Sequence, residues 1–294
     1  MSANIEYVRN ELEKIKSLPT LPVIATKLLH MVDQPDVSMT EISKIIVVDP
    51  ALTSRVLKIA NSPYYGVRNR IDTIKLALVV LGLAEIRNVL LSVSLFRTFG
   101  SMDDDDGFDQ ESFWRHSIAV AHFAKKIARD FRIRTHGEEF TAGLLHDIGK
   151  IIIAQYFSDA MSDIRNLMDV KGMPVYEAEE QALGLSHMDI GAWLAEKWKI
   201  PDHLTESIRY HHYPNLVMEN PLLTNLVCLA NLIANYLGIN QDPPPLHDDL
   251  VNHTSWGVLA EHSGLNTEID VEGYLASLED EKDEVDKYMA IAFV

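Results

Sequence analysis

Apolar residues recur along the chain with the spacing of amphipathic helices, and no sustained alternation of the kind seen in strands competes with them. The pattern predicts an all-α fold. One clear example begins at Asp49, which suits an N-cap, and continues with Pro50 at the first helical position, where the missing N–H costs nothing. Leu52, Val56 and Ile59 then form the predicted buried stripe of this helix.

Two glycines and two polar segments punctuate this pattern. The helices that follow are expected to end near Gly82 and Gly100, which suit left-handed C-terminal caps. Segment 100–110, GSMDDDDGFDQ, is expected to be a solvated linker because four adjacent aspartates repel one another, and it lacks the spaced ligands of an EF-hand. Segment 240–249, NQDPPPLHDD, is predicted to be a loop that its three prolines make stiff. These breaks predict a helical N-terminal part at 1–100, a helical core at 108–239 and a C-terminal helical extension at 240–294.

Composition narrows the class of protein. Across 294 residues, 43 acidic and 26 basic side chains give a formal charge of −17, which disfavours binding to nucleic acid or to an anionic membrane surface. The single cysteine, Cys228, excludes an internal disulfide and favours a reducing cytoplasm. The longest apolar run, 76–95, contains Glu85 and Arg87, so we expect no membrane-spanning helix and a soluble protein.

A histidine lies on the apolar face of the helix expected at 111–131. His116 follows Phe113 by three positions and precedes Val120 by four, so the helical period turns it inward, whereas His122 points elsewhere. A buried imidazole must be hydrogen-bonded, paired with a charge or bound to a metal. His116 is therefore either a satisfied core residue or a ligand.

The stretch GLLHDIGK, residues 143–150, places His146 beside Asp147. On one continuous helix, His146 and Lys150 would share a face, and Asp147 would lie above Gly143, whose small size would leave space beside the carboxylate. One interpretation is a surface Asp–Lys pair with a packed histidine. The other is a pair of metal ligands with an ammonium group placed for a phosphate.

Three further histidines stand at predicted helix ends. Ser186 and Asp189 have the spacing of a capping pair, which places His187 in the first turn of its helix, facing a neighbour. His211 and His212 are adjacent at the end of another helix and diverge by about 100°. They can share one ion only at the helix edge, or serve two ions with one ring each.

The apolar helix PLLTNLVCLANLIANYLG carries one polar stripe, made of Thr224, Cys228, Asn231 and Asn235. Such a stripe faces solvent or lines an internal polar cavity, and the sequence leaves both open. No role is assigned to the remaining histidines, His30, His136, His203, His247, His253 and His262.

The order of these residues resembles the HD metal-dependent phosphohydrolase superfamily, and its spacing from His146 onward is most similar to the HD-GYP branch. N-terminal stretches such as DPALTSRVLKIANS resemble the HDOD family, the HD-related output domain. The resemblance extends from about residue 15 to about residue 238. It implies an HD-like helical bundle with an additional N-terminal helical subdomain.

The resemblance also implies a ligand set for one or two divalent ions such as Fe²⁺ or Mn²⁺. The matching positions are His116, His146, Asp147, His187, His211 and His212. Asp147 takes the place that bridges two ions, and Lys150 takes the place that contacts substrate phosphate. Asn231 stands where HD-GYP enzymes carry their last aspartate ligand, and its neutral carbonyl is expected to weaken binding.

Three functions follow as hypotheses. The preferred one is a non-catalytic signalling output protein. It would bind partner proteins and retain a metal, nucleotide or phosphate ligand in the cleft that corresponds to the active site of HD enzymes. Asn231 favours this hypothesis. So does the stretch HHYPNLV, because HD-GYP enzymes have an acidic residue and a Gly-Tyr-Pro loop after the two histidines. The alternative is a metal-dependent phosphohydrolase acting on a nucleotide or phosphoester, with Asp147 and Lys150 as catalytic residues. The third is a scaffold with an empty site.

Overall fold

The computed structural model describes residues 2–15, 21–30, 39–62, 65–99, 108–217, 221–239, 242–264 and 269–292. Within these ranges every regular element is a helix, which confirms the predicted all-α class. The acidic segment at 100–107 and residues 240–241 of the proline-rich loop lie outside the described residues. The division at 1–100, 108–239 and 240–294 stays a prediction.

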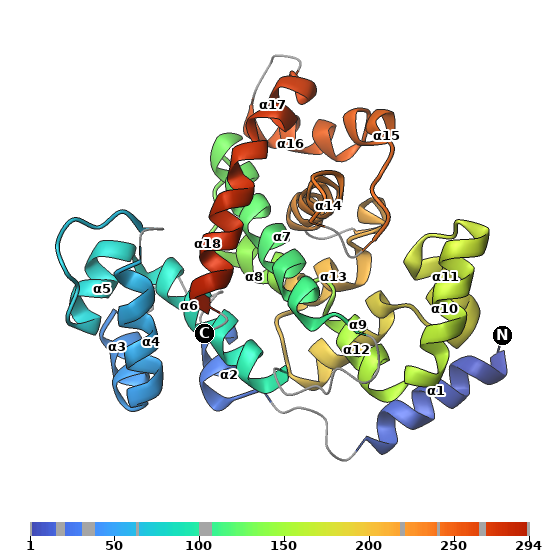
Figure 1. The fold of residues 1–294 in the computed structure, drawn as a ribbon, viewed down its shortest axis with the longest axis horizontal. Coiled ribbons are helices and arrows are strands. Elements are labelled where there is room, and N and C mark those ends of the chain that lie inside the picture. Colours follow the sequence, from blue (N-terminus) through green and yellow to red (C-terminus); the bar gives the residue numbers. More distant parts are fainter. Residues whose placement is uncertain are drawn as a thin grey trace.

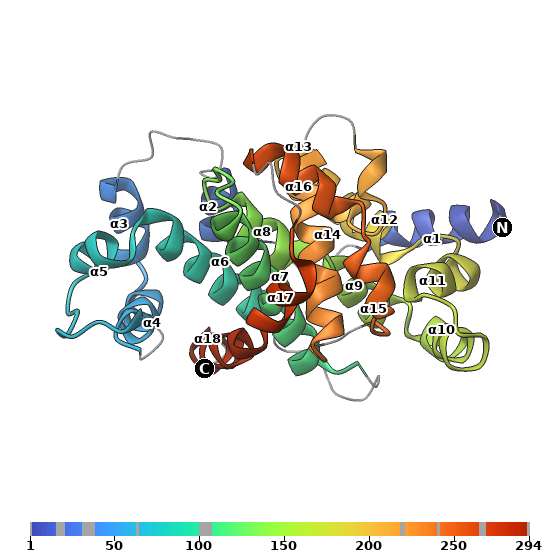
Figure 2. The same cartoon turned by 90° about the horizontal axis from the view of Figure 1, so that it is seen from above.

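The N-terminal helices flank the core at both ends. Helices α3, α4 and α5 gather at one end, whereas α1 lies at the opposite end beside α11 (Figures 1 and 2). Their bounds are α1 (Ser2–Lys14), α2 (Val23–His30), α3 (Met39–Val47), α4 (Pro50–Ala60), α5 (Ile74–Leu81) and α6 (Leu83–Phe99).

The local predictions for α4 are confirmed, and one for α5 is wrong. The Asp49 carboxylate accepts a hydrogen bond of 3.1 Å from the Leu52 N–H, and the predicted stripe is buried. Gly82 ends α5 with φ 84° but ψ 165°, which is not a left-handed helical conformation. The extended ψ turns the chain sharply into α6 instead of closing a helical cap. Gly100 lies outside the described residues.

The core surrounds α7 and α14, which pack against each other, while α8 packs on α7 and α9 packs on α12 (Figure 1). Helix α7 begins one residue before its predicted start and also ends one residue earlier. The elements are α7 (Gln110–Asp130), α8 (Glu138–Leu145), α9 (Ile148–Tyr156), α10 (Ser158–Lys171), α11 (Val175–Leu183), α12 (His187–Lys197), α13 (Asp202–Tyr210), η3 (Pro214–Leu216) and α14 (Pro221–Tyr236).

The C-terminal helices dock on this core. Helix α16 packs on α14, and α18 packs along α7 with further contacts to α4 and α6. Val285, Tyr288 and Met289 of α18 are buried, so these apolar side chains of the last helix are covered by the same chain. The elements are α15 (His247–Val251), α16 (Ser255–Ser263), α17 (Val271–Ser277), η4 (Glu279–Glu281) and α18 (Lys282–Ala292).

Two glycines, Gly143 and Gly149, let neighbouring helices of the core approach closely. A Cβ on Gly143 would lie 2.7 Å from the Ala121 Cα of α7. The expectation that Gly143 leaves space beside Asp147 is therefore wrong, because the glycine is used for backbone contact between α8 and α7. A Cβ on Gly149 would lie 2.0 Å from the His187 carbonyl oxygen, so this glycine brings α9 against the start of α12.

Among the described helices, none is by itself long and apolar enough to cross a membrane. Helices α5 and α6 together meet that test by length and composition, but they are bent by 115° where they join.

Candidate metal centre

The chain breaks its helix at the His146-Asp147 pair. Helix α8 ends at Leu145, α9 begins at Ile148, and Asp147 has φ −100° and ψ 10°. The prediction of one continuous helix carrying His146 and Lys150 on a shared face is therefore wrong. The break redirects α9 so that it packs against α12, a contact between distant parts of the chain that local helical propensity does not encode.

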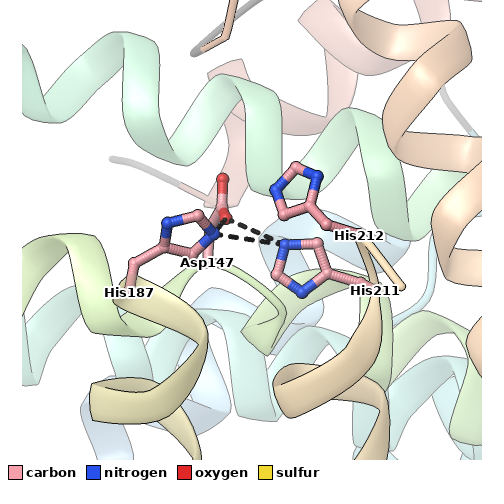
Figure 3. Close-up of side chains that lie close together, drawn as sticks. All are labelled: Asp147, His187, His211 and His212. Atoms are coloured by element: carbon pink, nitrogen blue, oxygen red, sulfur yellow. Dashed lines mark hydrogen bonds and ion pairs between the residues drawn. The ribbon is translucent and has the colours of Figure 1, made fainter. Parts of the chain in front are cut away.

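Asp147 is fully buried and lies at the centre of four histidines. Its Oδ1 is 3.2 Å from His187 Nε2 and 3.5 Å from His211 Nε2. Its Oδ2 is 3.3 Å from His146 Nε2 and 3.7 Å from His116 Nε2. Figure 3 shows His187 and His211 directed at the Asp147 carboxylate. Helices α7 and α12, the end of α13 and the α8–α9 turn thus bring these predicted residues together.

The same four histidines are held by their other ring nitrogen. Each Nδ1 has an oxygen acceptor, which places a proton on Nδ1 and turns Nε2 toward Asp147. This is the arrangement of metal-binding histidines, whose outer hydrogen bond sets the tautomer and the ring orientation. The acceptors are Ile239 O for His116 (2.7 Å), Gly143 O for His146 (2.7 Å), Ile208 O for His211 (2.9 Å) and Glu179 Oε2 for His187 (2.6 Å).

Several inward atoms of this centre are buried without a hydrogen-bond partner. They include Nε2 of His116, Nε2 of His146 and Oδ1 of Asp147. Unsatisfied polar atoms are uncommon in a protein interior, and a cation among them would satisfy all three. Nε2 of His187 and of His211 are 3.3 Å apart, close to the separation of two nitrogens about 2.0–2.1 Å from one ion.

The donor atoms fall into two groups that share Asp147. His116, His146 and Asp147 form one group, and Asp147, His187, His211 and His212 form the other. Within each group the donor atoms lie within 4.8 Å of one another. This buried cluster can hold a metal ion, and Asp147 belongs to both groups.

Burial and charge set the protonation states. Burial lowers the pKa of His146 to about 4, and it also lowers the pKa of His211. Burial opposes the charge of Asp147, but His146, Lys150 and His187 together hold its pKa well below the ordinary value. Burial would also lower the pKa of His187, but Glu179 and Asp147 outweigh this effect and raise it to about 9. A metal at His187 would therefore displace the Nε2 proton.

Lys150 is buried between two carboxylates. Its Nζ donates hydrogen bonds of 2.7 Å to Asp147 Oδ2 and of 2.7 Å to Asp242 Oδ1. Burial lowers the pKa of this ammonium, but the attraction of Asp147, Asp242 and Glu179 outweighs burial and raises it. The contact between Lys150 and substrate phosphate, implied by the resemblance, stays a prediction.

The polar stripe of α14 is buried, so it lies inside the molecule and not on its surface. Cys228, Asn231 and Asn235 line a cavity of about 380 Å³ that also borders His211 and His212. The Asn231 side-chain oxygen accepts a hydrogen bond of 2.9 Å from Asn235 Nδ2. Ligation of a metal by Asn231 stays a prediction.

Two carboxylates of the site were not among the predicted residues. Glu179 carries a usable signal, because it is spaced four from Val175 and four from Leu183 on the buried face of α11. It accepts hydrogen bonds from both Nδ1 and the backbone N–H of His187. Asp242 follows α14 in an irregular loop, where no periodic pattern identifies an inward side chain.

Replacement of Glu179 with glutamine is expected to lower metal affinity by about 10- to 100-fold, because the neutral amide holds the His187 ring less firmly and makes it a poorer donor. Titration of the metal-free protein with Mn²⁺ measures the change. Glu177→Gln removes an exposed carboxylate of the same helix and serves as the control. Equal affinities of the two variants would exclude a positioning role for Glu179.

The fold and the site define an all-helical protein with an HD-like histidine and aspartate centre. The chain matches the HDOD domain family over residues 18–214 and belongs to this family. An HDOD domain protein of unknown function from Geobacter sulfurreducens has a structure similar over 100% of this chain and 99% of that chain, with 26% identity and a TM-score of 0.87. The resemblance to HDOD proteins and the predicted helical bundle are thereby confirmed.

Two other relatives extend the comparison. A protein provisionally named a phosphohydrolase, from Shewanella amazonensis SB2B, is 27% identical with a TM-score of 0.71, over 97% of this chain and 98% of that chain. An uncharacterized protein from Treponema pallidum (strain Nichols) is 26% identical over 227 residues, 76% of this chain. The match spans 44% of that curated relative's length.

Proposed function

We propose that this HDOD protein is a non-catalytic regulatory protein of a signalling pathway that keeps divalent transition ions, such as Fe²⁺ or Mn²⁺, in its HD-like centre. The proposed ligands are His116, His146, Asp147, His187, His211 and His212. The unpartnered Nε2 atoms of His116, His146 and His212 support metal binding, as do the Nδ1 hydrogen bonds of the four histidines around Asp147.

The position of Lys150 carries the non-catalytic part of the proposal. Its ammonium is neutralised by Asp147 and Asp242, which leaves it poorly placed to attract a phosphate. The adjoining cavity presents Asp242 and Asp249, and no lysine or arginine occurs among the described residues that line it. A bound metal ion would therefore have to supply the positive charge that attracts a phosphorylated ligand to this cavity.

A metal-dependent phosphohydrolase is the second candidate, favoured by the six donors and by the relative from Shewanella. A bound ion would supply Lewis-acid polarisation of a phosphoryl oxygen and a hydroxide nucleophile. The chain's own part would be to hold that ion through its imidazoles and to orient the phosphoester in the cavity beside His212. Lys150 could then aid charge stabilisation only after leaving Asp242.

Elemental analysis of protein purified without added metal, combined with a hydrolysis assay, separates these functions. We expect one or two equivalents of transition metal, and no metal-dependent turnover of a generic phosphodiester or of a nucleotide panel. Metal-dependent hydrolysis that disappears in Asp147→Asn would establish the enzyme instead. Protein without metal, even after incubation with Fe²⁺ or Mn²⁺, would leave a scaffold with an empty site.

We also propose a kind of partner, a small ligand and a cell compartment for this protein. The preferred partner is another signalling protein, with a nucleotide or a phosphate as the candidate small ligand of the cavity. The single cysteine, buried on α14, supports a cytoplasmic protein.

A further inference from the structure

Asp242, in the loop after α14, places its carboxylate beside Lys150 and His212 of the candidate metal centre. Asp242 is 8% exposed, and its Oδ1 accepts the hydrogen bond of 2.7 Å from Lys150 Nζ. Its Oδ2 lies 3.8 Å from His212 Nε2. Asp242 therefore reaches a member of the His187, His211 and His212 group from a part of the chain that lies outside the resemblance to HD enzymes.

The Lys150 ion pair satisfies only one of the two Asp242 oxygens. Asp242 Oδ2 and His212 Nε2 are both buried without a hydrogen-bond partner, and they face each other. An unpaired buried acceptor is destabilising, so a purely structural ion pair explains this geometry poorly. Two donor atoms bound to one ion at about 2.0–2.2 Å lie roughly 3–4 Å apart, which agrees with the observed separation.

Described residues on either side of Asp242 contribute to its placement. The Ile239 carbonyl accepts the hydrogen bond from His116 Nδ1, three residues before Asp242. Pro243, Pro244 and Pro245 follow Asp242 directly and restrict the backbone of the next residues. The Asp242 N–H also approaches Asn235 Oδ1 at 3.4 Å. The backbone directly after Asp242 is thus restricted.

These contacts relate Asp242 to the missing aspartate of α14. Asn231 offers a neutral oxygen that accepts a hydrogen bond from Asn235, whereas Asp242 brings a negative charge to the same cavity. Because hard divalent ions prefer anionic oxygen, the carboxylate of the loop can replace the one absent at position 231.

We propose that Asp242 is a metal ligand, which binds through Oδ2 on the His212 side of the centre while Oδ1 keeps its hydrogen bond to Lys150. The carboxylate would join the group of Asp147, His187, His211 and His212 from the side of His212, and it would have to move toward the other three, because Asp242 is not among the donors that lie within 4.8 Å of one another. The inference rests on the proposed metal-binding function and adds that the C-terminal segment completes the site.

The test compares metal binding in matched variants, each stripped of metal and titrated with Mn²⁺. Asp242→Asn is expected to lower the affinity of one equivalent by at least about 10-fold, since a ligand is lost and not only its outer support. Asp249→Asn removes an exposed carboxylate at the rim of the same cavity, and we expect wild-type affinity from it. Wild-type affinity in Asp242→Asn would overturn the inference but leave the proposed function standing.

A second pair of variants separates ligation from support of Lys150. Lys150→Met removes the cation, so the added change Asp242→Asn no longer leaves a buried charge unpaired and folding is protected. If Asp242 binds metal, the double variant should bind Mn²⁺ at least about 10-fold more weakly than Lys150→Met alone. Equal binding by these two proteins would show that Asp242 serves only Lys150. A wild-type protein that binds no Mn²⁺ would overturn metal binding and this inference together.

Discussion

Asp147→Asn is expected to abolish stoichiometric metal binding, because Asp147 belongs to both donor groups and its carboxylate is the charge that they share. The asparagine has the same size, so the buried site is not opened. Lys150 keeps Asp242, and His187 keeps Glu179, which limits the loss of stability from unpaired charge. Elemental analysis after purification, with the variant and the wild type prepared in parallel, measures the effect.

Asp163→Asn provides the matched control, since Asp163 is exposed on α10 and outside both donor groups. It should retain the wild-type metal content. One full equivalent of metal retained in Asp147→Asn would show that metal binding does not depend on a shared carboxylate. The bridging role of Asp147 would then be excluded.

Gly149→Ala is expected to lower the free energy of unfolding by about 3 kcal/mol or more, because the new methyl group overpacks the α9–α12 contact. The clash is with backbone, since the Cβ would lie 2.0 Å from His187 O and 2.8 Å from Gly191 N, and no side-chain rotation relieves it. The thermal midpoint should fall by about 6 °C or more at roughly 2–4 °C per kcal/mol. His187 would also move relative to Asp147, so metal affinity should decrease.

Gly257→Ala is the corresponding control. A Cβ on this helical glycine meets nothing within 4 Å, and alanine is favoured over glycine in a helix by about 1 kcal/mol. Its thermal midpoint should stay the same or rise slightly. If Gly149→Ala melts at the wild-type temperature, the close approach of α9 and α12 is not required by the fold.

Local signals in the sequence anticipate much of the site. The 3.6-residue period turns His116 inward, and the capping box of Ser186 and Asp189 places His187 at the first position of α12. The sequence also predicts that His211 and His212 stand at a helix end, and His211 is the C-cap of α13. These predictions succeed because they depend on interactions within one or two helical turns.

Other features depend on contacts between distant segments. The break between α8 and α9 and the close approach at Gly143 and Gly149 arise where separate helices meet. The interior position of the α14 stripe also depends on what packs around it. A helical period says that residues share a face, but it does not say whether that face meets solvent or a cavity.

The sequence by itself therefore determined the helical class and the inward position of His116, because periodicity and capping act over a few residues. The rest of the histidine set followed from the family resemblance. Only the tertiary structure decided that four Nε2 atoms converge on Asp147 and that Lys150 lies between two carboxylates. It also decided that Asp242 reaches the site, since an irregular loop has no repeating pattern and its course depends on the surfaces that it packs against.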